Sequence, residues 1–181
     1  MKPLPTPDIS GIKLLQPHIF NDERGYFFES YNYETFKNLG ITDVFVQDNQ
    51  SFSKKNVIRG LHFQVPPFAQ AKLVRVIQGV VLDVAVDLRK ASPTYGQHFS
   101  VTLSADNQLQ LYIPVGFAHG FAALEEDTIF VYKCSHFYHK DSEKNILFND
   151  EDLNINWNIK NPVIIDKDLQ AMRFQDFSSP F

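Results

Sequence analysis

Residues 81–88 read Val-Leu-Asp-Val-Ala-Val-Asp-Leu, and their character changes with a period of two. Successive side chains of a β-strand point to opposite faces of its sheet. One face of this run is therefore apolar from Leu82 to Leu88, whereas the other carries Asp83 and Asp87. The pattern predicts a strand with one apolar and one polar side.

Similar runs, rich in β-branched and aromatic residues, lie on both sides of this strand and are mostly separated by turn residues. They cover residues 12–20, 26–31, 44–52, 57–63, 72–77, 98–103, 109–113 and 128–134. One internal helix is predicted over residues 33–39, capped by Asn32 and ended by Gly40. A short helix is expected after Asp168, which by itself looks like the N-cap of that helix. The sequence thus predicts an all-β fold, an antiparallel barrel or jelly roll with a few short helices and a ligand pocket at its mouth.

The length of 181 residues, without an internal repeat or linker, predicts a single domain over residues 1–181. The formal net charge of -4 argues against nucleic acid or an anionic membrane as partner, because both require a basic surface. Cys134 is the only cysteine, so an intrachain disulfide is excluded. No apolar stretch has the length of a signal peptide or a membrane-spanning helix, and we expect a soluble cytoplasmic protein.

The densest polar cluster lies at residues 59–64, which read Arg-Gly-Leu-His-Phe-Gln. Strand alternation places Gly60, His62 and Gln64 on one face, with open space at Gly60 beside the imidazole. Histidine titrates near neutral pH, so His62 is a candidate general base whose tautomer a carboxylate would fix. Taken alone, a hydrogen-bonded structural histidine is the commoner alternative.

Two further strands carry candidate groups. Lys72 begins an apolar strand and shares an inward face with Val74 and Val76, where its ammonium could stabilise an enolate oxygen or a phosphate. The alternative is a strand-end lysine that reaches solvent. Alternation in residues 128–134 places Tyr132 on the same face as Phe130 and Cys134. Tyr132 keeps its phenolic proton at neutral pH and is a candidate general acid, with a wall-packed tyrosine as the alternative.

Residues 114–120 read Pro-Val-Gly-Phe-Ala-His-Gly and fit the P-x-G-x-x-H element of cupins, in which a turn leads into a strand and places the histidine, here His119, inside a barrel. A metal cupin would normally add an H-x-H pair, but the matching stretch reads His62-Phe63-Gln64. One ligand is missing, so we expect no metal and no other cofactor. An iron site made by two histidines and a carboxylate stays as the alternative.

Taken together, the motifs resemble the dTDP-4-dehydrorhamnose 3,5-epimerase family, cupin-like enzymes of dTDP-L-rhamnose biosynthesis. The similarity extends over nearly the whole chain. It is carried by residues 22–29, 47–49, 59–64, 69–74, 83–89, 92–94, 113–121, 132–134, 149–150 and 166–168. The resemblance implies a cupin-like jelly-roll β-barrel and an isomerase that inverts C3 and C5 of dTDP-4-dehydro-6-deoxy-D-glucose.

The resemblance also implies roles for individual residues. His62 would be the base, oriented by Asp168, with Tyr132 as the acid on the opposite sugar face and Lys72 at the enolate oxygen. Tyr138 would stack on thymine. The other residues expected to bind the substrate are Arg24, Glu29, Gln47, Asp48, Asn49, Arg59, His119, Glu143 and Lys167. A homodimer is implied, with Arg24 and Glu29 reaching the site of the partner subunit.

Other functions are compatible with parts of the pattern. An epimerase that acts at C3 only or C5 only would carry the same histidine, tyrosine and lysine. A metal-dependent cupin dioxygenase or isomerase is disfavoured by Gln64. A sugar-nucleotide binding module without activity would have no reason to keep His62, Lys72, Tyr132 and Asp168 together.

Overall fold

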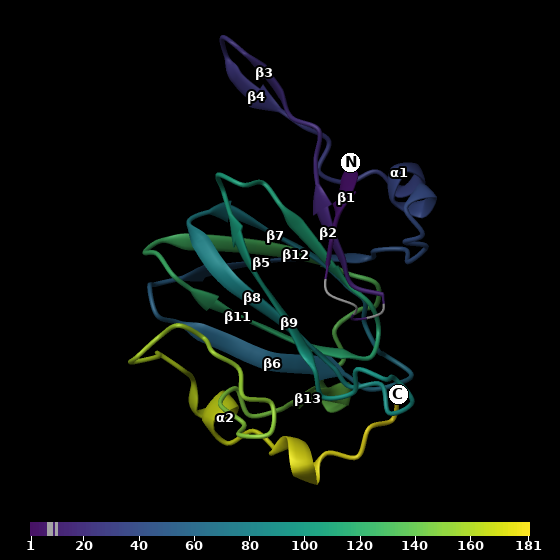
Figure 1. Ribbon diagram of the computed structural model, residues 1–181, viewed down its shortest axis with the longest axis vertical. Helices are drawn as coiled ribbons and strands as arrows, with labels where there is room; N and C mark the ends of the chain where they lie inside the picture. The colour runs from purple at the N-terminus through teal and green to yellow at the C-terminus, as the bar shows by residue number, and fades with distance from the viewer. Residues whose placement is uncertain (7–8, 10) are drawn as a thin grey trace.

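The computed structural model describes residues 1–6, 9 and 11–181, and two antiparallel sheets dominate it (Figure 1). The six-stranded sheet has the order β1-β2-β10-β7-β12-β5, with bounds Lys2–Leu4, Lys13–Gln16, Gln110–Ile113, Lys72–Gln78, Thr128–Cys134 and Gln47–Ser53. The five-stranded sheet has the order β13-β6-β11-β8-β9, with bounds Glu143–Asn145, Ile58–Gln64, Phe117–Ala123, Val80–Asp87 and His98–Ser104. The sheets form a cupin-like jelly-roll barrel, which confirms the predicted fold class.

Apolar side chains from both sheets fill the space between them. The six-stranded sheet contributes Val74, Val76 and Phe130, and the five-stranded sheet contributes Val81, Ala85 and Phe121. A second apolar cluster lies on the outer face of the five-stranded sheet, where residues 146–181 cover it with side chains that include Phe148 and Trp157. Both faces of this sheet are therefore buried.

This covering changes the meaning of the alternation in residues 81–88. Leu82, Val84 and Val86 of β8 pack beneath the C-terminal segment rather than inside the barrel. The polar side of the strand is not solvated, because Asp83 and Asp87 have no exposed surface. The predicted strand is correct, and its carboxylates are interior groups.

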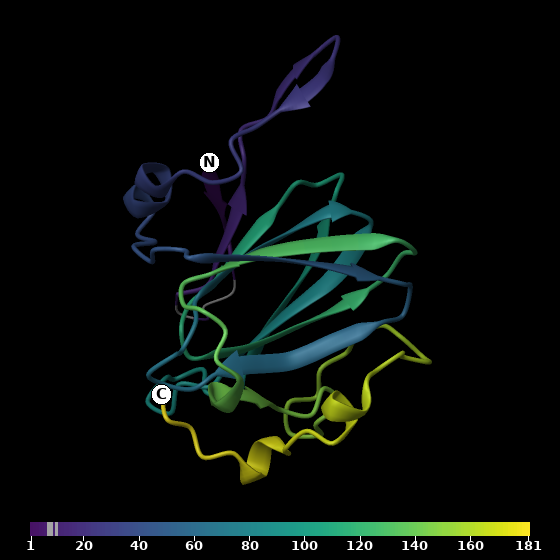
Figure 2. The same ribbon diagram turned by 180° about the vertical axis from the view of Figure 1, so that it is seen from behind.

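Several predicted boundaries need correction. The run at residues 12–20 is broken, because β2 ends at Gln16, directly before Pro17, and β3 (Phe20–Asp22) belongs to another sheet. The run at 26–31 is also shorter than predicted, since β4 covers only Gly25–Phe27 and pairs with β3 in a hairpin. This hairpin projects away from the barrel in both ribbon views (Figures 1 and 2).

The internal helix is confirmed as α1 (Tyr33–Asn38), whose first turn is capped by the Asn32 side chain. Helix α2 (Asp166–Leu169) begins before Asp168, so the predicted N-cap role of Asp168 is wrong. Two short 3-10 helices span Lys140–Ser142 and Phe174–Asp176. None of the helices in the described part of the chain has the length and hydrophobicity that a membrane crossing requires.

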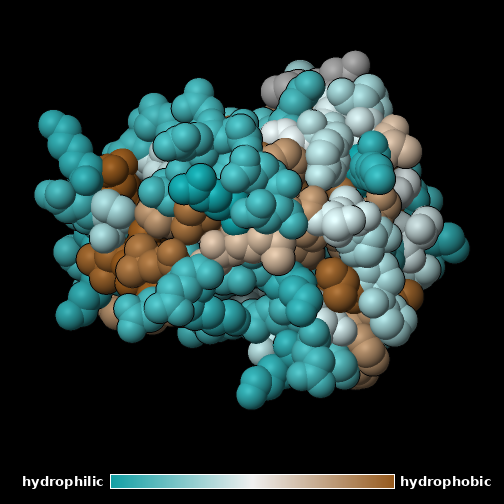
Figure 3. Space-filling model, turned by 90° about the horizontal axis from the view of Figure 1, so that it is seen from below, coloured by the Kyte–Doolittle hydropathy of each residue, from teal (hydrophilic) through white to brown (hydrophobic). Residues whose placement is uncertain are grey.

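The C-terminal segment is held on both sides of α2. Val163 pairs with Val57 in a parallel bridge, and Met172 pairs with Ile146 in another. Seen from below, where this segment runs, the surface shows a band of hydrophobic residues between hydrophilic ones (Figure 3). The bridges bring α2 against β6 and thereby place Asp168 beside one end of the barrel interior.

Candidate active site

A cavity of about 680 Å³ opens into the barrel between strands of both sheets and the segment that leads into α2. Ten of the predicted site residues line it: Gln47, Asn49, Arg59, His62, Lys72, His119, Tyr132, Tyr138, Glu143 and Asp168. A volume of this size is typical of small-molecule sites. The fold thus gathers most of the predicted site in one place.

His62 and Asp168 form a hydrogen-bonded pair at the wall of this cavity. His62 Nε2 lies 2.7 Å from Asp168 Oδ1, and the backbone N–H of Gly60 donates to Asp168 Oδ2 at 3.3 Å. Burial would raise the pKa of Asp168, but the hydrogen bond and charge of His62 outweigh it and lower the pKa. The Asp168 side chain is 2% exposed and that of His62 is 29% exposed. An ionised carboxylate thus holds one ring nitrogen and leaves the other free to take a proton.

Arg59 enters the cavity because the pairing of β6 is irregular. Strict alternation would point Arg59 away from the face that carries His62. The register against β11 shifts between the pair His119–His62 and the pair Phe121–Arg59, and such irregularities re-aim side chains near functional sites. The guanidinium is held by Ser53 Oγ at 3.1 Å and by the carbonyl of Phe52 at 3.0 Å.

Lys72 is buried and points into the barrel, so the alternative of a solvent-reaching lysine is wrong. Its Nζ donates to the carbonyl of His62 at 3.3 Å and lies 6.0 Å from the ring centre of Tyr132. Burial lowers the pKa of the ammonium, and the nearby Cys134, Asp83 and Glu143 oppose that shift. A desolvated cation in a cavity is suited to bind a developing negative charge.

Tyr132 lines the cavity from β12, on the sheet opposite His62. Its neighbours Phe130 and Cys134 line the same cavity, which confirms that the three residues share a face. Burial raises the pKa of Tyr132, and the charge of Arg59 acts in the other direction. The phenol therefore keeps its proton at neutral pH and can donate it.

His119 is held by a residue that the sequence did not single out for the site. His119 Nε2 lies 2.9 and 3.1 Å from the two carboxylate oxygens of Asp83, and both side chains are buried. Burial lowers the pKa of His119, and the opposing effect of the Asp83 carboxylate is smaller. The polar face of residues 81–88 was the available signal for Asp83, because a buried carboxylate needs a partner.

Four predicted binding residues meet at the mouth of the cavity. The Tyr138 hydroxyl donates to Glu143 Oε2 at 3.0 Å, and the backbone N–H of Tyr138 donates to Gln47 Oε1 at 2.8 Å. Lys167 Nζ lies 2.5 Å from the same Glu143 oxygen. Burial would raise the pKa of Glu143, but its bonds with Lys167 and Tyr138 lower it.

Four predicted residues do not line this cavity: Lys167 reaches its mouth through the pair with Glu143, and the other three lie away from it. Asp48 lies on the other face of β5 from Gln47 and Asn49, and its carboxylate pairs with Lys133 at 2.8 Å. Arg24 belongs to the projecting hairpin, where its side chain is 85% exposed and pairs with Asp22. Glu29 follows the hairpin and accepts a hydrogen bond from Asn32 at 3.0 Å.

Gln64 faces the cavity, as alternation predicts, but both ends of its amide are bonded to backbone groups. In residues 1–6, 9 and 11–181, no cluster of three or more His, Cys, Asp or Glu side chains could hold a metal ion. Metal independence stays a prediction, which turnover in the presence of a chelator tests.

The chain is similar to known proteins over most of its length. A profile described as dTDP-4-dehydrorhamnose 3,5-epimerase matches residues 6–176. The chain is 57% identical over 150 residues to the dTDP-4-dehydrorhamnose 3,5-epimerase of Salmonella typhimurium, which is 82% of each chain. The crystal structure of the Elizabethkingia anophelis dTDP-4-dehydrorhamnose 3,5-epimerase superposes with a TM-score of 0.93 and 49% identity, covering 97% of both chains.

A third relative has a ligand. The dTDP-6-deoxy-D-glucose-3,5-epimerase of Legionella pneumophila was crystallised in complex with dTDP-4-keto-L-rhamnose. It superposes with a TM-score of 0.92 and 45% identity, over 96% of this chain and 93% of the other. These matches span nearly all of the chain, and the chain therefore belongs to the dTDP-4-dehydrorhamnose 3,5-epimerase family and is an isomerase.

Proposed function

We propose that the chain inverts C3 and C5 of dTDP-4-dehydro-6-deoxy-D-glucose and produces dTDP-4-dehydro-L-rhamnose. The observation that carries this proposal is one cavity lined by a His62–Asp168 pair on one sheet and Tyr132 on the other. The buried Lys72 is close to both, with its Nζ 3.3 Å from the carbonyl of His62 and 6.0 Å from the ring centre of Tyr132. A base and an acid on opposite walls are what an inversion at carbon requires. The Legionella relative, which binds a 4-keto-sugar nucleotide, supports the substrate class.

The proposed reaction consists of two rounds of proton transfer. His62 takes the hydrogen from the carbon beside the C4 ketone, and the electrons of the C–H bond move to the C4 oxygen as an enolate. The Lys72 ammonium stabilises that oxygen, because a preorganised cation in a desolvated site favours developing charge. Tyr132 then gives its proton to the same carbon from the opposite face. Solvent restores both groups before the second carbon reacts.

The second part of the proposal is a homodimer in which Arg24 and Glu29 complete the site of the partner subunit. Its support is the hairpin, which projects away from the barrel (Figure 2). The hairpin carries the exposed side chains of Phe20, Tyr26 and Phe27. Arg24 is also too exposed in this chain to bind anything held in the chain's own cavity. Within each site, Arg59 and His119 would bind the sugar and diphosphate, with Lys167 and Glu143 nearer the nucleoside.

Mixing two inactive variants tests the shared site. In a mixed dimer of His62→Ala and Arg24→Ala, one of the two sites has both an intact His62 and an intact Arg24. We expect the mixture to recover up to about a quarter of the wild-type turnover, because half of the dimers are mixed and each has one working site. If the mixture stays inactive while differently tagged subunits co-purify as mixed dimers, Arg24 acts within its own chain or not at all.

The catalytic roles are tested in deuterated water with NMR, which follows label uptake and stereochemistry at C3 and C5 in the same tube. His62→Ala should stop both exchange and product formation, because it removes the group that takes the proton. Tyr132→Phe should reduce epimerised product by about 10²- to 10⁴-fold, while exchange falls less. Loss of both in Tyr132→Phe, with exchange retained in His62→Ala, would reverse the two roles.

The alternative is an epimerase that acts on only one of the two carbons. The same assay separates it, since a C3-only or C5-only enzyme leaves one carbon in its original configuration. The stereochemistry of the product at equilibrium is the measurement that decides between them.

A further inference from the structure

Residues 136–139, here called the mouth loop, follow β12 and place Tyr138 at the mouth of the cavity. The Tyr138 residue is 56% exposed. An exposed aromatic side chain is ordinarily free to sample several rotamers, and fixing one of them costs free energy when a ligand binds. The contacts of this loop remove much of that freedom before any ligand arrives.

Every residue of the mouth loop has a backbone group bonded to the side chain of a glutamine. Gln70 Nε2 donates to the carbonyl of His136 at 2.7 Å, and Gln64 Nε2 donates to that of Phe137 at 3.2 Å. Gln47 Oε1 accepts from the Tyr138 N–H at 2.8 Å, and Gln64 Oε1 accepts from the His139 N–H at 2.7 Å. Three glutamines from three parts of the chain thus hold one loop.

Gln64 is the centre of this arrangement. It is 4% exposed, and its amide nitrogen also donates to the carbonyl of Phe68 at 2.6 Å. The ring of Phe68 in turn stacks on His139, with centroids 3.9 Å apart and planes 6° from parallel. Both N–H groups and the oxygen of Gln64 are therefore used to join residues 65–70 to the mouth loop.

We infer that Gln64 and Gln70 are positioning residues for nucleotide binding, which act by holding the backbone of the mouth loop so that Tyr138 stands ready to receive the base. The inference rests on the proposed function, in which Tyr138 stacks on the base. Gln47 contributes from β5, and Glu143 fixes the other end of Tyr138 through its hydroxyl. Neither Gln64 nor Gln70 needs to touch the nucleotide for this role.

The test compares the binding of dTDP and of inorganic pyrophosphate by calorimetry. Gln64→Met keeps the length of the side chain and removes three hydrogen bonds, so the Kd of dTDP and the KM should rise about tenfold. The affinity for pyrophosphate and the kcat at saturation should change less than twofold. Gln70→Met removes one bond and should raise the dTDP Kd about threefold, which keeps the test valid if Gln64→Met folds poorly.

The control is Trp157→Phe, which removes a buried bond from Trp157 Nε1 to the carbonyl of Phe148 at 2.7 Å, in the core outside the barrel. It should lower the Tm without changing the dTDP Kd. Equal weakening of dTDP and pyrophosphate in the glutamine variants, or an unchanged dTDP Kd in both of them, overturns the inference.

A double-mutant cycle distinguishes the inference from the function on which it rests. If Gln64 acts through Tyr138, then Gln64→Met should add little to the loss of dTDP affinity in Tyr138→Ala. Fully additive losses would show that Gln64 acts elsewhere and overturn the inference alone. If Tyr138→Ala itself leaves dTDP affinity unchanged, the proposed role of Tyr138 fails and the inference fails with it.

Discussion

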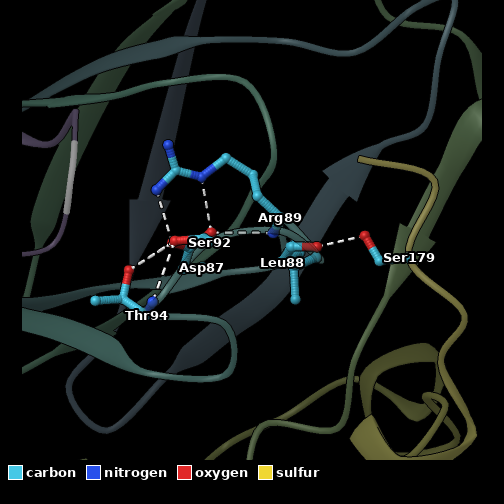
Figure 4. A network of polar contacts seen from close by, with 6 residues as sticks. All are labelled: Asp87, Leu88, Arg89, Ser92, Thr94 and Ser179. Carbon is cyan, nitrogen blue, oxygen red and sulfur yellow. Dashed lines mark hydrogen bonds and ion pairs between the residues drawn. The ribbon is translucent and has the colours of Figure 1, made fainter.

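Two polar clusters in this barrel each contain a buried charged group and differ in how completely their groups are bonded. The first surrounds Asp87 at the end of β8 (Figure 4). Its carboxylate accepts bonds from Arg89 Nε at 2.8 Å and Nη2 at 2.6 Å, Ser92 Oγ at 2.6 Å and Thr94 Oγ1 at 2.7 Å. All of these donors follow Asp87 within seven residues, so the whole cluster lies within one short segment of the chain.

The second cluster lies in the cavity, and its groups have fewer hydrogen-bond partners. Among the described residues, the Lys72 ammonium makes one hydrogen bond, to the carbonyl of His62 at 3.3 Å, and burial lowers its pKa. His62 uses one ring nitrogen on Asp168 and is otherwise accessible from the cavity. A bound substrate can therefore interact with the Lys72 ammonium and with the second ring nitrogen of His62.

The comparison teaches that buried charge alone does not mark a reactive group. Burial raises the pKa of Asp87, but the bonds from Arg89, Ser92 and Thr94 lower it to about 2 overall. The Arg89 backbone N–H also donates to this carboxylate, at 3.0 Å. A carboxylate with five such bonds has no capacity left for a substrate, and it contributes to stability. The ammonium of Lys72 costs stability and is available for chemistry. Three predictions test this division.

Lys72→Met should have the largest effect. Removing the cation that faces the enolate oxygen should lower kcat by about 10²- to 10³-fold. The free energy of unfolding should stay unchanged or rise slightly, because a desolvated charge is replaced by an apolar side chain of similar length. Turnover and urea denaturation measure the two effects, and Lys144→Met, at the exposed position of β13, is the control. A large loss of stability with normal turnover would show that Lys72, like Asp87, stabilises the fold and takes no part in the reaction.

Asp87→Asn should show the opposite behaviour. The substitution leaves Arg89 without its buried counter-charge and should lower the free energy of unfolding by about 3 kcal/mol. We expect kcat to remain within twofold of the wild type at a temperature where the variant is folded, because Asp87 does not line the cavity. Urea denaturation and the turnover assay check this pair of values. A tenfold fall in kcat would mean that the two clusters are coupled.

The smallest expected effect concerns the free energy of unfolding at low pH. The pKa of Asp87 is about 2 in the folded protein, below its ordinary value of 3.8. The folded state therefore favours the carboxylate, and this stabilisation is present above about pH 4 and is lost as the pH falls toward 2. The difference corresponds to roughly 2 kcal/mol. Unfolding free energy measured from pH 5 to pH 2 should decline less steeply in Asp87→Asn than in the wild type, and parallel declines would contradict the assignment.

Local pattern was enough for much of the fold and for part of the site. Alternation placed Lys72 with Val74 and Val76 inside the barrel, and Tyr132 on the same face as Phe130 and Cys134. Asn32 and Gly40 marked the limits of α1. These features depend on neighbouring residues, whose geometry is set by the backbone of a strand or a helix.

Local pattern did not predict the long-range contacts of the site. From its own neighbours Asp168 looked like an N-cap, and only its resemblance to known enzymes linked it to His62, from which 106 residues separate it. The aim of Arg59 depends on an irregular pairing with β11, and the partner of Asp83 is a histidine on that same strand.

The sequence by itself determined most of the barrel strands, the first helix, the family and ten of the residues that line the cavity. Only the tertiary structure decided that the apolar face of β8 lies beneath the C-terminal segment, that Asp48 faces away from Gln47's cavity, and that three glutamines hold one loop. The physical reason is that side-chain direction follows from local backbone geometry. Which groups meet depends on how distant segments pack, and many packings share one local pattern.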